Sequence, residues 1–262
     1  MNSRLAGALV WRDFRIELSY RVPWMLDAIG LVSVLAIYFY IVRFTRALAP
    51  GANNFFTYIV PGLALIRFQL GLGRTLASMD REQSSGTLEL LISSPVRAWA
   101  VVAAASLYEL SRSLVMALIA LALGRWLFGA GLTLGPRSWP ALGFGLVGAA
   151  AFYLALTGVT CAVLIAFKQG LPVAGVLGAV LPVISGIYFS PHVLPAFLHS
   201  LTNIFPLSLA VQVVRAGVVA GSFPVGKTVV MLATSFACLP LSAIAIHAAV
   251  ARARRLGTLG QY

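Results

Sequence analysis

Two short stretches of the chain match patterns that hold nucleotides in other proteins. Residues 221–228 read GSFPVGKT, which satisfies the phosphate-loop pattern G-x-x-x-x-G-K-[ST], and residues 143–148 contain G-x-G-x-x-G. The first pattern needs a preceding strand and an acid for magnesium, and the second needs an acid for the ribose. No Asp or Glu follows Glu109 in the chain. We therefore expect neither stretch to bind a nucleotide, and we expect the glycines of 143–148 to let helices approach closely.

The other reactive side chains form no catalytic or metal-binding pattern. The three histidines lack metal-ligand spacing, and Cys161 and Cys238 lie inside apolar stretches that predict small buried side chains. Seven acids and three histidines supply no clustered catalytic set. The sequence therefore predicts a protein that is not an enzyme and binds no metal or cofactor itself.

Composition indicates where such a chain resides. Hydrophobic residues make up 60% of it and charged residues only 10%, whereas soluble domains are about 25% charged. The net charge is +12, but the arginines gather at the ends of apolar segments and form no basic stripe with aromatic residues. The pattern favours a membrane protein over one that binds nucleic acid.

Six apolar segments predict membrane-spanning helices, because about 20 helical residues cross the roughly 30 Å of hydrocarbon. We expect an all-α membrane protein with a six-span domain over 24–250. An amphipathic helix over 1–23 should lie on the cytoplasmic face, and residues 251–262 should form a basic cytoplasmic tail. The expected spans are about 24–44, 55–76, 97–124, 140–167, 171–189 and 226–250.

The basic residues outside the spans predict the orientation. In this arrangement eleven Lys and Arg residues fall on one side of the membrane and six on the other. The richer side holds both termini, which the positive-inside rule places in the cytoplasm. We expect a multi-pass protein of a bacterial-type cell (inner) membrane, with Lys227 anchoring the outer end of the last span.

Three charged residues are predicted to lie deep within the spans. Arg67 and Glu109 should reach similar depths from opposite sides, and Arg112 follows Glu109 by one helical turn. A charge at the bilayer centre costs about 2.5–3.5 kcal/mol on insertion scales, so pairing is expected. Two roles remain open, namely a structural ion pair between Arg67 and Glu109, and a direct part in substrate passage or proton relay.

The loop over 78–97 (SMDREQSSGTLELLISSPVR) holds three of the seven acids. Gly86 and the two serines before it interrupt the preceding helix, Thr87 can start a new one, and Pro95 ends it. The resulting two turns should present Glu89 beside an apolar face. Because that face would be exposed in the cytoplasm, it predicts a partner surface.

This loop, particularly Gly86-Thr87-Leu88-Glu89 followed by Leu90-Leu91 and Pro95, resembles the cytoplasmic loop of type 2 ATP-binding-cassette exporter permeases. A second run, Ser185-Gly186-Ile187-Tyr188-Phe189 followed by Pro195, Pro206 and Arg215, resembles that family's segment between its last two spans. Together with six spans and the amphipathic N-terminus, the resemblance covers nearly the whole chain.

The resemblance implies a transmembrane permease that pairs with a second copy, lies among membrane lipids and docks a nucleotide-binding ATPase subunit. ATP and magnesium would be bound by that subunit, whose hydrolysis would drive export of an amphiphile such as a drug, lipid or lipid-linked glycan. Thr87 to Ile92 would be the cytoplasmic coupling helix. The residues expected at this partner surface are Glu82, Gly86, Thr87, Leu88, Glu89, Leu91 and Ile92.

The segment over 190–224 is too apolar for a solvated loop and too short for two crossings. We expect its prolines to divide it into two re-entrant half-helices that enter the outer leaflet and pack on protein. The residues that mark this region are Gly186, Pro195, Pro206 and Arg215.

An alternative function belongs to another class. An ion-coupled secondary transporter would use Arg67, Glu109 and Arg112 for coupling and would work without an ATPase. Copurification with a nucleotide-binding subunit, and sensitivity of transport to vanadate, would separate the two functions.

Overall fold

The computed structural model describes residues 21–48, 55–84, 98–167, 170–188 and 202–256. Within these ranges the chain forms helices and no strands, which confirms the all-α prediction. The helices are α2 (Arg21–Leu48), α3 (Phe55–Ser84), α5 (Ala98–Trp126), α6 (Ser138–Phe167), α7 (Gly170–Ile184), α9 (Pro206–Val218) and α10 (Val225–Leu256).

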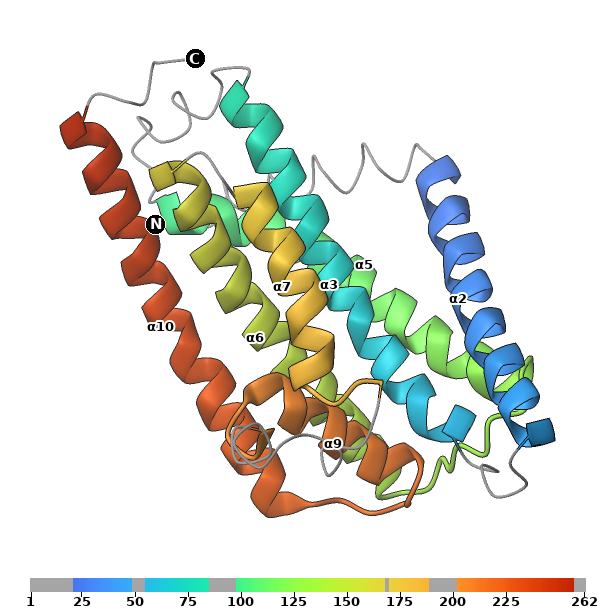
Figure 1. Ribbon diagram of the computed structural model, residues 1–262. Helices are drawn as coiled ribbons and strands as arrows, with labels where there is room; N and C mark the ends of the chain where they lie inside the picture. Colours follow the sequence, from blue (N-terminus) through green and yellow to red (C-terminus); the bar gives the residue numbers. More distant parts are fainter. Residues whose placement is uncertain (1–20, 49–54, 85–97, 168–169, 189–201, 257–262) are drawn as a thin grey trace.

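The long helices run alternately up and down the bundle (Figure 1). We call the end at which α2 begins and α10 finishes the upper end, and the end at which α9 lies the lower end. α3 finishes and α5 begins towards the upper end, so both helices that flank residues 85–97 point there. This is the alternation that the predicted order of spans requires.

Five of the described helices are long and apolar enough to cross a membrane: α2, α3, α5, α6 and α10. They match the expected first, second, third, fourth and sixth spans. The expected fifth span instead forms α7, which has 15 residues and a length of about 22 Å at 1.5 Å per residue. It ends early because the chain turns at Gly186, whose φ is 67°.

The centre of the bundle is built around α3 and α6. α6 packs on α10, α9 and α3, and α3 packs on α5, α6 and α7. A Cβ on Gly145 would lie 2.4 Å from a methyl of Val214 in α9, and one on Gly148 would lie 2.6 Å from the terminal methyl of Met231 in α10. The prediction that glycines in 143–148 permit close helix approach is therefore confirmed at these two positions.

A proline in α7 explains a polar contact inside the bundle. Pro182 has no N–H to donate to the carbonyl of Gly178, four residues earlier. The side-chain Nε2 of Gln69 in α3 donates to that carbonyl instead, at 2.8 Å. The amide thereby satisfies a backbone acceptor that lipid could not, and it joins α7 to α3.

The stretch GSFPVGKT forms the turn between α9 and α10. Gly221 adopts a φ of 61°, and α10 begins at Val225, so Lys227 lies in the first turn of that helix. A helix precedes the stretch where a phosphate loop requires a strand. The Nζ of Lys227 donates to Oε1 of Gln212 in α9 at 2.8 Å, so this lysine fastens two helices at the lower end.

Candidate functional site

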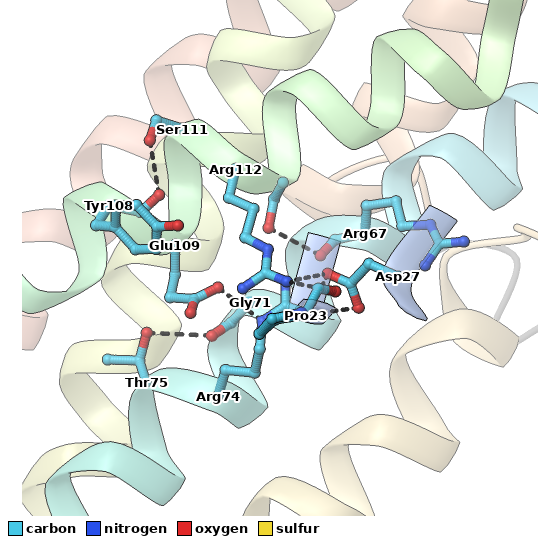
Figure 2. A network of polar contacts seen from close by, with 11 residues as sticks. Pro23, Asp27, Arg67, Gly71, Arg74, Thr75, Tyr108, Glu109, Ser111 and Arg112 are labelled. Atoms are coloured by element: carbon cyan, nitrogen blue, oxygen red, sulfur yellow. Dashed lines mark hydrogen bonds and ion pairs between the residues drawn. The ribbon is translucent and has the colours of Figure 1, made fainter. Parts of the chain in front are cut away.

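Four charged side chains from three helices meet in the upper half of the bundle (Figure 2). Asp27 comes from α2, Arg74 from α3, and Glu109 and Arg112 from α5. Arg74 donates through Nε to Oε2 of Glu109 at 2.7 Å and through Nη1 to Oδ2 of Asp27 at 3.1 Å. We call these four residues the charge network.

Arg112 is the most enclosed member of the network. The residue is 4% exposed, and its Nη2 lies 2.7 Å from Oδ2 of Asp27 and 3.2 Å from the backbone oxygen of Pro23. Its guanidinium also lies over the ring of Trp24, with Cζ 5.1 Å from the centroid. Asp27 thus forms ion pairs with both Arg74 and Arg112. These pairs join α2 to α3 and α5 by charge as well as by packing.

A small residue allows the network to form. A Cβ on Gly71 would lie 2.5 Å from Oγ of Ser113, so α3 and α5 approach more closely here than a larger side chain allows. Oγ of Ser113 then donates to the backbone oxygen of Arg67 at 3.0 Å. The close approach places Arg74 within reach of Glu109, one turn from Ser113 along α5.

The predicted ion pair between Arg67 and Glu109 is corrected by this geometry. Glu109 pairs with Arg74, while the Arg67 guanidinium is directed away from Glu109 (Figure 2). The prediction was based on the equal depth of the two residues in the membrane. Depth does not determine the face of the helix from which a side chain projects. Arg74 and Arg67 lie two turns apart on α3, and the α5 carboxylate is oriented towards Arg74.

Two members of the network were missed from the sequence. Asp27 lies in the first apolar segment, and as a lone acid in a predicted span it should have been singled out. Arg74 was counted with the basic residues of the cytoplasmic loop after the second span, so it was not considered as a partner for Glu109, whereas it lies within α3. Its spacing of seven residues from Arg67 places both on one face of α3, which was the available signal.

A cavity of about 580 Å³ opens beside the network, between α2, α3 and α5. All four network residues line it, together with Arg81 and Glu82 from the last turns of α3. Pro23, Leu26, Ala77 and Ala105 give it apolar walls. A concave site with apolar walls and a few charged groups is the usual form of a small-molecule site.

Most of the predicted ATPase surface lies outside the described residues. Gly86, Thr87, Leu88, Glu89, Leu91 and Ile92 fall in 85–97, and the predicted coupling helix stays a prediction. Glu82 is described, near the end of α3, where it lines the cavity. The N-terminal helix expected over 1–23 also lies outside the description, except for the start of α2.

At the lower end, Arg215 of α9 joins three helical regions, and none of its hydrogen-bond acceptors among the described residues is an acid. Its Nε donates to the backbone oxygen of Tyr58 at 2.9 Å and its Nη1 to the phenol oxygen of Tyr58 at 2.8 Å. The carbonyls of Gly186 and Ile187 accept at 2.7 and 2.6 Å. The guanidinium also lies 3.7 Å from the Tyr58 ring centroid. We call this arrangement the arginine clamp.

The predicted re-entrant region is described in part. Pro206 starts α9, a helix of 13 residues, and Gly186 forms the turn whose carbonyl the clamp binds. α9 packs on α6, α10 and α3. Pro195 and the expected first half-helix lie in 189–201, outside the described residues.

The alternating apolar helices and their buried charge network define a multi-pass helical membrane protein. Comparison with known families identifies it further: the ABC-2 type transporter family matches residues 7–219, and the chain belongs to that family. It is the transmembrane component of an ABC transporter. A search of curated proteins finds no match.

Proposed function

We propose that the chain is the permease subunit of an ABC exporter and forms the pathway for an amphiphilic substrate, driven by a separate ATPase subunit. The family match carries this proposal, since permeases of this family work with a nucleotide-binding ATPase. α3 ends at Ser84 and α5 begins at Ala98. These two helices therefore lead from the 85–97 loop into the bundle and would supply a physical route for the coupling.

The charge network supports that route. Arg74 and Glu109 join α3 to α5 at 2.7 Å, and Asp27 connects α2 to both arginines. A push on the 85–97 loop would move α3 and α5 together and would carry α2 with them, because the ion pairs resist separation inside the bundle. ATP-driven closure of the ATPase pair would thus alter the packing of the spans.

The same proposal includes an orientation and a second copy. The upper end would face the cytoplasm with both termini, in a bacterial-type inner membrane. α2 packs mainly on α3 and α5 and leaves large apolar side chains exposed, including Met25, Ile29 and Phe44. In a homodimer a second copy would cover part of this face, and lipid would cover the rest.

Copurification tests the ATPase partnership. The chain is coexpressed with a candidate P-loop ATPase subunit, and the complex is isolated through a tag on the ATPase. Glu89→Arg should reduce the yield of complex about tenfold or more. The proposed contact pairs Glu89 with a basic residue of the ATPase, and the arginine would repel that residue. Lys227→Ala, at the lower end, is the matched control and should leave the yield unchanged. An unchanged yield and unchanged coupled activity in Glu89→Arg would refute the coupling assignment.

A further inference from the structure

α9 is a short helix that is buried in the lower end of the bundle (Figure 1). It has 13 residues, which give about 20 Å at 1.5 Å per residue, too little to cross the hydrocarbon. All of its residues except Gln212 and Ala216 are buried, because α9 packs on α6, α10 and α3. α9 thus occupies the lower end of the bundle without spanning it.

The upper end of the bundle is arranged differently. There the cavity of about 580 Å³ opens between α2, α3 and α5. A transport pathway that is open at one end has to be closed at the other, because access to the two sides alternates. In the proposed orientation, this arrangement would be open towards the cytoplasm and closed by α9 on the opposite side.

The arginine clamp fixes α9 to α3. Arg215 donates through Nε to the backbone oxygen of Tyr58 and through Nη1 to its phenol oxygen, at 2.9 and 2.8 Å. Both acceptors belong to one residue in the first turn of α3. The carbonyls of Gly186 and Ile187 accept the other hydrogen bonds of the guanidinium. The position of α9 therefore depends on α3 and on the 186–187 turn together.

The 186–187 turn also rests directly on α3. A Cβ on Gly62 would lie 2.6 Å from the backbone oxygen of Ile187, and the same oxygen accepts from Nη2 of Arg215 at 2.6 Å. From this contact α3 runs on to Ser84, beside the 85–97 loop, and carries Arg74 of the charge network on the way. One helix of 30 residues thus joins the clamp to the proposed coupling region.

We propose that the arginine clamp is a latch that holds α9 across the lower end of the pathway, and that movement of α3 opens it by drawing Tyr58 away from Arg215. The two residues act by positioning α9. The described acceptors of Arg215 are all neutral, so opening leaves one unpaired charge instead of two. This inference rests on the proposed function and deepens it by assigning the step at the lower end.

The test measures how fast a cysteine on the buried face of α9 reacts. Ser208 is 0% exposed and lies seven residues before Arg215, on nearly the same face. The Ser208→Cys chain, with Cys161→Ala and Cys238→Ala, is purified in neutral detergent and treated with a charged maleimide. Tyr58→Phe keeps the ring and the backbone carbonyl and removes only the phenol oxygen. It should raise the labelling rate about tenfold, as expected for one hydrogen bond to a charged group.

Two controls separate opening of the latch from general loosening. Gln69→Leu breaks a different contact of α3, the hydrogen bond to the Gly178 carbonyl, and should leave labelling at the Ser208→Cys position unchanged. Ser222→Cys, exposed after α9, should react rapidly with and without Tyr58→Phe. Equal labelling of the buried thiol with and without Tyr58→Phe would overturn the proposal, as would an equal increase in Gln69→Leu.

The complex with its ATPase subunit tests what moves the latch. With Tyr58 intact, ATP and vanadate should raise labelling of the Ser208→Cys thiol about tenfold, the increase that Tyr58→Phe gives without ATP. They should add little to the Tyr58→Phe rate, whereas a tyrosine with a purely structural role would leave the effect of ATP intact.

The two proposals fail separately. ATP-driven transport with no change in labelling would overturn the latch and leave the proposed function standing. Absence of ATP-driven transport would instead remove the proposed function, and the comparison of Tyr58→Phe with Gln69→Leu in the chain alone would still decide whether the clamp holds α9 closed.

Discussion

The charge network and the arginine clamp both bury arginine in an apolar bundle, but they satisfy it differently. Arg112 and Arg74 meet carboxylates from other helices, whereas Arg215 meets carbonyls and a phenol. The clamp's backbone acceptors are the carbonyls of the 186–187 turn, just beyond the end of α7, and the carbonyl of Tyr58 in the first turn of α3. A charge held by carbonyls fixes one arrangement of the backbone, while a charge held by acids ties neighbouring helices together through their side chains.

The largest expected effect is loss of the clamp. Arg215→Leu should lower the free energy of unfolding by about 3–5 kcal/mol, because several buried acceptors lose their donor at once. Arg215→Lys should recover only part of this, since an ammonium lacks the planar fork that reaches Tyr58 and the 186–187 turn together. Thermal unfolding of the purified chain measures both. A melting temperature within a degree of the wild type for Arg215→Leu would show that the clamp is unimportant.

Substitutions in the charge network should destabilise the protein less than loss of the clamp does, and the effects of two such substitutions should depend on one another. Asp27→Asn should cost about 2–3 kcal/mol, because Arg112 and Arg74 keep only their other partners. The double variant Asp27→Asn with Arg112→Gln should be less destabilised than the sum of the single changes, by about 0.5–3 kcal/mol. Strict additivity in this double-mutant cycle would mean that the ion pair has no energetic role. The same experiment cannot be made with an ion pair at the clamp, because the described contacts of Arg215 include no acid.

Loss of the uncharged hydrogen bond from Gln69 to the Gly178 carbonyl should destabilise the protein by an intermediate amount. Gln69→Leu removes the donor to the Gly178 carbonyl that Pro182 leaves free, and it should cost about 1–3 kcal/mol. Gln69→Glu should be at least as damaging, because a carboxylate cannot donate to that carbonyl when ionised. Comparing the two melting temperatures checks this explanation, and a more stable Gln69→Glu protein would refute it.

The smallest effect is expected at Lys227. Its bond to Gln212 is exposed, so Lys227→Ala should change stability by less than about 0.5 kcal/mol. ATP hydrolysis by the reconstituted complex should stay within experimental error of the wild type. Loss of nucleotide binding by the chain alone would instead revive the phosphate-loop interpretation of GSFPVGKT.

These regions also show what the sequence can and cannot predict. Helix positions followed from apolar length, so α2, α5, α6 and α10 begin within a few residues of expectation. The second span was expected over about 55–76, and the helix that holds it was expected to be interrupted by Gly86 and the two serines before it; α3 ends at Ser84. Once Arg74 was placed outside the membrane, Arg67 was the remaining cation for Glu109.

The partner of a buried charge depends on helix rotation and on close approaches such as Gly71 against Ser113. Neither is visible in one sequence. Arg215 was singled out by its place in a motif, but its acceptors come from Tyr58 and from residues 186–187. Backbone carbonyls carry no sequence signal, so only the fold reveals them.

The most direct test of the central claim is transport in proteoliposomes that contain the chain with and without its ATPase subunit. A fluorescent anionic lipid analogue is placed in the membrane, and its appearance in the opposite leaflet is followed. The account predicts movement only when ATPase, ATP and magnesium are all present, with inhibition by vanadate. Movement driven by an ion gradient with the chain alone, unaffected by vanadate, would contradict it and would favour a secondary transporter.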